Sequence, residues 1–226
     1  MPPINFLLQG NAGTELIYSF IIIICNLMIY HATKEMYQLS SYKGIKYFRQ
    51  AFLFFAIAYF FRYSIKFLLV FFDVKGILEI SPMFIGIISL FFYLYFTSMA
   101  IFFLLYSIIW KNDSTNSKRL FYIFNIVALV IALIGIFFTG PEMPFILNII
   151  LLIIAFIVLL TNQKDYKKKK ERNLFIIYTL LFIFGSLNII DILIPDFFQF
   201  FQMLLYLASI SIFMIILYKV LKRVGD

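Results

Sequence analysis

The sequence predicts an all-α polytopic membrane protein, a bundle of seven transmembrane helices forming a single domain over residues 1–226. Of its residues, 64% are hydrophobic, whereas water-soluble domains are about 45–50% apolar. Seven apolar stretches are each close to or above the length of about 20 residues that a membrane helix needs. Basic residues follow every second stretch. The connections are too short to fold as separate domains.

The first three helices are expected at roughly 14–33, 47–72 and 84–110. The first stretch lacks the basic start and small-residue cleavage site of a secretory signal, so we expect it to remain in the membrane. The second is apolar except for Arg62 and Lys66 in its interior. The third is apolar with scattered hydroxyl side chains, which could either line a pocket or form hydrogen bonds to neighbouring helices.

The fourth helix, expected at 120–139, carries a stripe of small or polar residues: Asn125, Ala128, Ala132 and Gly135. Their spacings of 3, 4 and 3 place them on one helix face. Small residues allow the backbones of two membrane helices to approach closely. We therefore predict that this stripe packs against another helix, either within the bundle or in a dimer.

The last three helices are expected at 143–161, 173–193 and 197–218. The fifth is almost entirely apolar, and the sixth carries Asn188 and Asp191 in its second half. In topology, size and charge bias the chain resembles seven-helix receptors and opsins. The last helix has no interior lysine, however, and a retinal protein needs one to hold its chromophore.

The basic residues predict the orientation. All 19 lysines and arginines except Arg62, Lys66 and Lys75 follow an odd-numbered stretch or lie in the C-terminal tail. Because basic loops stay in the cytoplasm, we expect an external N-terminus and a cytoplasmic C-terminus in a multi-pass protein of the cell membrane. The net charge of +8 then reflects topology and contact with anionic lipids, and nucleic acid is not an expected partner.

Arg62 and Lys66 are the basic residues that topology leaves unexplained. They are four positions apart on one helix face, and a charge near the bilayer centre costs about 2.5–3.5 kcal/mol. Asn188 and Asp191 are expected at a similar depth. We predict that these four residues converge on a carboxylate, a phosphate or a lipid headgroup in the outer half of the bundle. The alternative is that Lys66 extends to the outer headgroups and Arg62 forms a structural ion pair.

The other polar residues of the helices give no catalytic set. Cys25 and His31 are the only cysteine and histidine, which argues against a disulfide framework and a metal site. Asn26 and Asn148 are expected to donate hydrogen bonds to neighbouring helices. We expect no catalytic residue, no metal and no cofactor, and therefore no enzyme, because a nucleophile paired with a base is missing.

The leading functional interpretation is a receptor-like or sensory protein that binds a small or lipidic anion. A first alternative is a small-molecule transporter with a three-plus-one-plus-three helix plan, since a shift of 123 positions aligns Arg49 with Arg172 and Asp73 with Asp196. A second alternative is a structural or assembly subunit that uses the fourth-helix stripe as its partner surface. The expected partners are the lipid bilayer, the anionic or lipid ligand, and a separate cytoplasmic or membrane protein.

Overall fold

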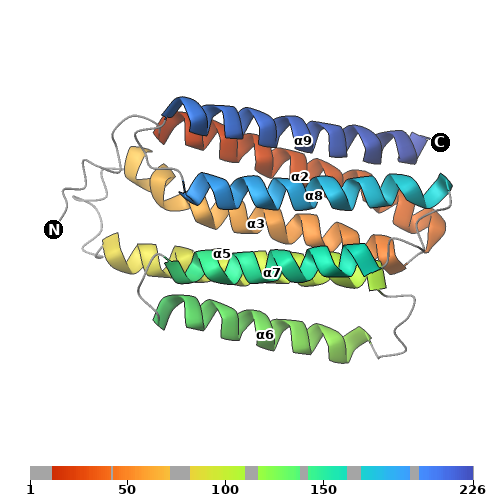
Figure 1. Cartoon of the computed structure of the whole chain (residues 1–226), viewed down its shortest axis with the longest axis horizontal. Helices are drawn as coiled ribbons and strands as arrows, with labels where there is room; N and C mark the ends of the chain where they lie inside the picture. The colour runs from red at the N-terminus through yellow and green to blue at the C-terminus, as the bar shows by residue number, and fades with distance from the viewer. Residues whose placement is uncertain are drawn as a thin grey trace.

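The structure, a computed structural model, describes residues 12–41, 43–71, 82–109, 117–137, 142–161, 169–193 and 199–225. The all-α prediction is confirmed, and each of the seven predicted stretches corresponds to one helix (Figure 1). The helices are α2 (Ala12–Ser40), α3 (Lys43–Phe71), α5 (Pro82–Ile109), α6 (Ser117–Phe137), α7 (Glu142–Thr161), α8 (Lys169–Leu193) and α9 (Gln199–Gly225).

Two helices are longer than hydropathy predicts. α2 was expected to end near residue 33 and continues to Ser40, and α9 was expected to end near residue 218 and continues to Gly225. The added segments are rich in Lys, Glu, Met, Gln, Leu and Arg, which are good helix formers without being uniformly apolar. Hydropathy marks only the apolar part of a helix, so polar extensions beyond it were missed.

The end of α2 has a left-handed cap. Ser41 has a φ of 51°, and its backbone N–H donates a 2.8 Å hydrogen bond to the carbonyl oxygen of Tyr37. This bond satisfies one of the carbonyl groups that a helix C-terminus leaves without an intrahelical partner. Glycine usually occupies such a position, because a side chain makes the left-handed conformation less favourable.

Four of the described helices contain segments long and apolar enough to cross a membrane. The segments are Gly13–Leu39 in α2, Gly86–Ile109 in α5, Arg119–Phe137 in α6 and Phe200–Lys222 in α9. The 20 residues of α7 extend about 30 Å at 1.5 Å per residue, which matches the hydrocarbon thickness of a bilayer. The chain is therefore a helical membrane protein.

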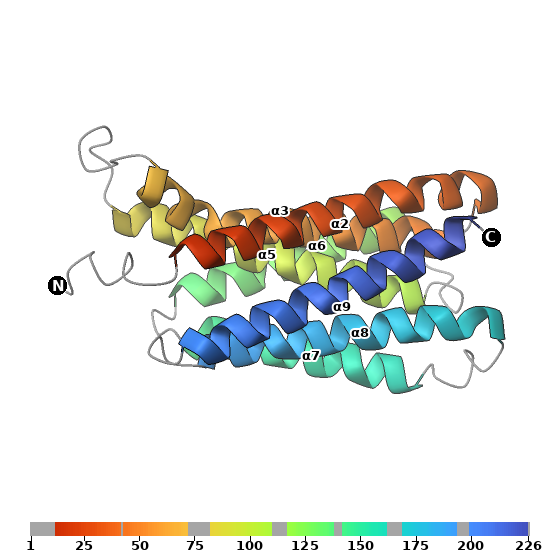
Figure 2. The ribbon, with the colours of Figure 1, turned by 90° about the horizontal axis from the view of Figure 1, so that it is seen from above.

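The helices form two layers, each in chain order. Figures 1 and 2 together place α2, α3, α5 and α6 side by side in one layer and α9, α8 and α7 in the other. Packing joins α2 to α3, α3 to α5, α5 to α6, α7 to α8 and α8 to α9. α2 also packs against α9, and α7 packs against both α5 and α6. The bundle is therefore a closed ring of helices.

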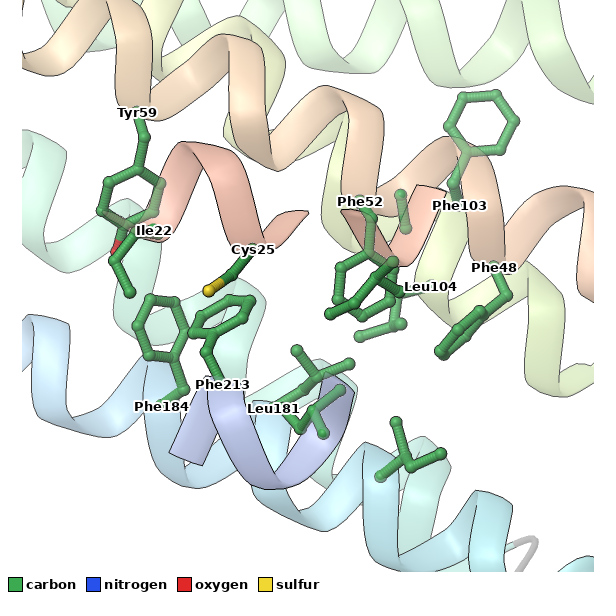
Figure 3. Packing of buried hydrophobic residues seen from close by; sticks show 14 of the residues in the cluster. Ile22, Cys25, Phe48, Phe52, Tyr59, Phe103, Leu104, Leu181, Phe184 and Phe213 are labelled. Carbon is green, nitrogen blue, oxygen red and sulfur yellow. The ribbon is translucent and has the colours of Figure 1, made fainter. Parts of the chain in front are cut away.

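The core lies between the two layers. Figure 3 shows Cys25 of α2 beside Phe184 of α8 and Phe213 of α9, with Phe52 of α3 further along. The rings of Phe184 and Phe213 meet edge to face with centres 4.4 Å apart, a favoured aromatic geometry. Phe52 and Phe213 are completely buried. The packing around Phe52, Phe184 and Phe213 is therefore apolar.

The outer surface and the ends of the bundle differ in chemistry. α6 presents large apolar side chains outward, such as Ile126 at 64% exposure and Phe137 at 78%, as a lipid-facing helix requires. The described basic side chains at the C-terminal ends of α2 and α9 and the N-terminal ends of α3 and α6 share one end of the bundle (Figure 1): Lys34, Lys43, Lys46, Arg49, Arg119, Lys219 and Lys222. We call this the basic end; in the predicted orientation it is cytoplasmic.

Candidate functional site

Arg62 lies in the half of the bundle away from the basic end, two-thirds of the way along α3. Its side chain is half-buried, and its guanidinium carbon is 5.3 Å from the ring centre of Tyr63. The same carbon is 5.7 Å from the ring centre of Tyr93, which belongs to α5. Both distances fall within the range of a cation–π interaction, which contributes about 0.5–2 kcal/mol depending on desolvation.

Four buried tyrosines from three helices lie together beside Arg62. Tyr18 of α2 stacks on Tyr206 of α9 with ring centres 4.4 Å apart. The rings of Tyr59 and Tyr63, both from α3, contact the Tyr18 ring edge to face, with ring centres 6.5 Å and 6.4 Å apart. We refer to Tyr18, Tyr59, Tyr63 and Tyr206 as the tyrosine cluster. Each of them is at most 7% exposed, so four phenol groups are held inside the bundle.

The tyrosine cluster extends toward α8 and along α9. Tyr59 contacts the ring of Phe184 at 5.9 Å, which brings α8 beside α3 at this depth. Gln202, one turn before Tyr206, is 5% exposed, and Ser209 is 2% exposed. Buried amides and hydroxyls inside a membrane protein need hydrogen-bonding partners, so this half of the bundle has a partly polar interior.

Of the four predicted ligand-binding residues, the structure describes the side chain of Arg62 only. The side chains of Lys66, Asn188 and Asp191 lie outside the described residues. The backbone positions of Asn188 and Asp191 follow Phe184 along α8 by about one and two turns. α3 and α8 run in the same direction, and Tyr59 contacts Phe184 between them. Convergence of the four residues stays a prediction.

The tyrosine cluster was not predicted from the sequence, although part of its signal is local. Tyr59, Arg62 and Tyr63 have the spacing i, i+3, i+4, which places them on neighbouring positions of one helix surface. That pattern could have drawn attention to the two tyrosines. Nothing local indicates Tyr18 or Tyr206, because they meet only when the first and last helices pack together.

The small-residue stripe of α6 faces α5. Ala128 and Ala132 are fully buried, and Gly135 is buried as well. The Tyr95 hydroxyl of α5 donates a 2.5 Å hydrogen bond to Oδ1 of Asn125, and the amide nitrogen of Asn125 donates to the Phe121 carbonyl oxygen at 2.7 Å. This face of α6 is therefore occupied within the chain.

The remaining polar residues singled out from the sequence are three on α2 and Asn148 on α7. Asn26 is fully buried, and its amide nitrogen donates to the Ile22 carbonyl oxygen of its own helix at 2.8 Å, so the expected interhelical bond from this amide was wrong. Asn148 lies outside the residues with described side chains. Cys25 is a free, buried thiol, and His31 is exposed beside the ring of Tyr30. Within the described residues, no three His, Cys, Asp or Glu side chains gather as a metal site would require.

Comparison with known proteins relates the chain to one whole-length relative. No protein-family model matches it, and no solved structure matches it. An uncharacterized protein from Archaeoglobus fulgidus is 31% identical over 240 aligned residues, covering 99% of this chain and 96% of the relative. The similarity thus includes the helices that carry Arg62 and the tyrosine cluster. This helical membrane protein therefore belongs to the same family as the Archaeoglobus fulgidus protein.

Proposed function

We propose that this protein is a receptor-like membrane protein that binds a small or lipidic anion between Arg62 and the tyrosine cluster. The observation that carries the proposal is the position of Arg62, half-buried and within 5.3 Å and 5.7 Å of two tyrosine ring centres. A guanidinium at this depth costs free energy unless protein, water or a ligand compensates for it. Its planar fork binds carboxylate or phosphate through paired hydrogen bonds.

The tyrosines define the second part of the preferred ligand. Aromatic rings offer apolar surface, and their hydroxyl groups offer hydrogen bonds. A ligand with an anionic head and a flat or aliphatic body would satisfy both Arg62 and the cluster, as would the headgroup and upper chain of an anionic lipid. Binding would shift the equilibrium between two arrangements of the bundle only if the ligand prefers one of them. We propose no catalytic step.

Of the two alternatives, assembly through the α6 stripe has the weaker support. Ala128 and Ala132 of that stripe are buried against other helices of the same chain, so a partner protein would need a different surface. Transport is compatible with the anion site, because a transporter must also bind what it moves.

The test measures the melting temperature of the protein in lipid nanodiscs with three probes. Phenyl phosphate combines an anion with a ring, inorganic phosphate lacks the ring, and phenyltrimethylammonium has the opposite charge. We expect phenyl phosphate to raise the melting temperature most and the cation to leave it unchanged. At a ligand concentration of 100 times Kd the stabilisation is about 2.7 kcal/mol.

Two matched variants identify the site. Arg62→Gln removes the proposed anion partner, and Arg119→Gln removes an exposed arginine at the basic end. We expect the phenyl phosphate effect to vanish in the first and persist in the second. If Arg62→Gln does not fold, Arg62→Lys replaces it in the comparison. Lysine keeps the positive charge but lacks the planar fork of the guanidinium, so we expect a weaker phenyl phosphate effect. An equal effect in all variants would refute the site. Native mass spectrometry separates a co-purified anionic lipid from a small bound anion, because the two add different masses to the protein.

A further inference from the structure

The two layers of the bundle correspond to the two halves of the chain. The first three helices, α2, α3 and α5, lie in one layer, and the last three, α7, α8 and α9, form the other (Figures 1 and 2). α6 joins them and packs at the edge, against α5 and α7. Exchanging α2 with α7, α3 with α8 and α5 with α9 leaves the packed pairs among these six helices unchanged, because α2–α9 becomes α7–α5. Parallel-repeat transporters have this arrangement.

Away from the basic end, the layers meet through aromatic rings. Tyr18 of α2 stacks on Tyr206 of α9 at 4.4 Å, and Tyr59 of α3 contacts Phe184 of α8 at 5.9 Å. These contacts cross from one layer to the other beside Arg62. Separation of the layers at this end would therefore open the surroundings of the proposed anion site.

Near the basic end, a second set of contacts crosses between the layers. The hydroxyl groups of Ser107 on α5 and Tyr178 on α8 lie 2.8 Å apart in a buried hydrogen bond. The Tyr178 ring also contacts Phe48 of α3 at 5.9 Å. Phe48 and Tyr59 are both on α3 and differ by about 16 Å in height at 1.5 Å per residue. The layers are thus closed at two distinct depths.

Within each layer the helices are joined by close aromatic packing. α3 and α5 share the Phe54–Phe103 stack at 5.2 Å and the Phe61–Phe92 stack at 4.6 Å. In the other layer, Phe156 of α7 stacks on Phe182 of α8 at 4.5 Å. Dense packing transmits motion as a rigid unit. Movement of one layer against the other would have to break and re-form the contacts between layers, including the packing of α2 on α9.

We propose that the two layers rock against each other and carry the anion bound at Arg62 across the membrane by alternating access. This inference rests on the proposed anion site and adds transport to it. The Tyr18–Tyr206 stack closes one side, and the Ser107–Tyr178 hydrogen bond closes the other. The apolar packing around Phe52 and Phe213 lies between the two closures, and the two helix layers pivot there.

Uptake into proteoliposomes tests transport directly. The probe is radiolabelled phenyl phosphate, whose charge limits passive permeation. We expect uptake with the natural chain and with Arg119→Gln, and a decrease of about 10- to 100-fold with Arg62→Gln, which corresponds to a lost charge-assisted hydrogen bond of 1.5–3 kcal/mol. Probe-dependent stabilisation without uptake above that of empty liposomes would overturn transport and leave the receptor-like function. Neither stabilisation nor uptake would overturn both.

Spin-label distances test the rocking motion without any ligand. In a Cys25→Ser background, one label pair at Lys46 and Lys222 reports the basic end, and a pair at Phe84 and Phe200 reports the opposite end; all four positions are exposed. Tyr178→Phe removes the hydroxyl that closes the basic end. We expect the basic-end distance to lengthen while the opposite distance shortens. Distances that stay fixed, or that lengthen together, would contradict alternating access.

Discussion

Tyr18 of α2 stacks on Tyr206 of α9, with ring centres 4.4 Å apart and ring planes inclined by 19°. The two residues come from the first and last helices, so their contact helps to close the ring of helices. It also forms one wall of the tyrosine cluster beside Arg62. The same stack therefore contributes to stability and to the candidate site.

The first prediction concerns the Tyr18 ring. Tyr18→Ala should lower the free energy of unfolding by about 3 kcal/mol, as expected for removal of a buried aromatic ring. Tyr18→Phe keeps the ring and should cost about 1 kcal/mol through its lost hydroxyl. Thermal unfolding of the two variants in the same detergent measures the difference. Equal stability of the Ala and Phe variants would show that the stack contributes nothing.

The second prediction concerns the hydrogen bond between Ser107 and Tyr178, whose oxygen atoms are 2.8 Å apart. Ser107→Ala and Tyr178→Phe should each destabilise the chain by about 1–3 kcal/mol, because each leaves a buried hydroxyl partner unsatisfied. The double variant should cost less than the two single costs added together. A double-mutant cycle measures this coupling, and strictly additive costs would mean that the bond has no energetic role.

The third prediction concerns the close approach of α7 and α8 at Gly185. A Cβ atom added there would lie 2.5 Å from Cδ1 of Leu152. Gly185→Ala should therefore cost about 1 kcal/mol, since the end of the Leu152 side chain can move aside, and Gly185→Val should cost more. Leu152→Ala should remove most of the extra penalty of Gly185→Val. No recovery in that double variant would show that another contact limits the space.

The fourth prediction concerns the helix cap at Ser41, where φ is 51°. Ser41→Gly should stabilise the chain by about 0.5–1 kcal/mol, because glycine adopts this conformation without a steric penalty. Ser41→Val should destabilise it, since a β-branched residue tolerates positive φ poorly. Chemical unfolding of both variants provides the comparison. Opposite signs for the two substitutions are the expected signature.

The seven helices of the described residues and their approximate locations could be predicted, because membrane spans need long apolar segments. The seven helices coincide with the seven stretches, and errors are confined to ends such as Ser40 and Gly225, where polar helix formers extend the helix. Arg62 was singled out from the sequence because topology does not explain its charge, and its role in binding a ligand stays a prediction. The extra length of α2 and α9 is set by helix propensity and capping, which hydropathy does not measure.

The tyrosine cluster could not be predicted in the same way. Tyr18 and Tyr206 lie near opposite ends of the chain, and their contact depends on how α2 packs against α9. Periodicity identifies which residues share a helix face, as for Tyr59 and Tyr63, but does not identify the helix that they face. Packing of the two layers determines that relationship.

The central claim is that Arg62 and the tyrosine cluster bind an anion. The most direct test is calorimetric titration of phenyl phosphate into nanodiscs that contain the natural chain, Arg62→Gln or Arg119→Gln. We expect saturable binding to the natural chain and to Arg119→Gln, with Kd raised about 10- to 100-fold in Arg62→Gln. Saturable binding with the same Kd in all three proteins, or no binding to the natural chain, would contradict the claim.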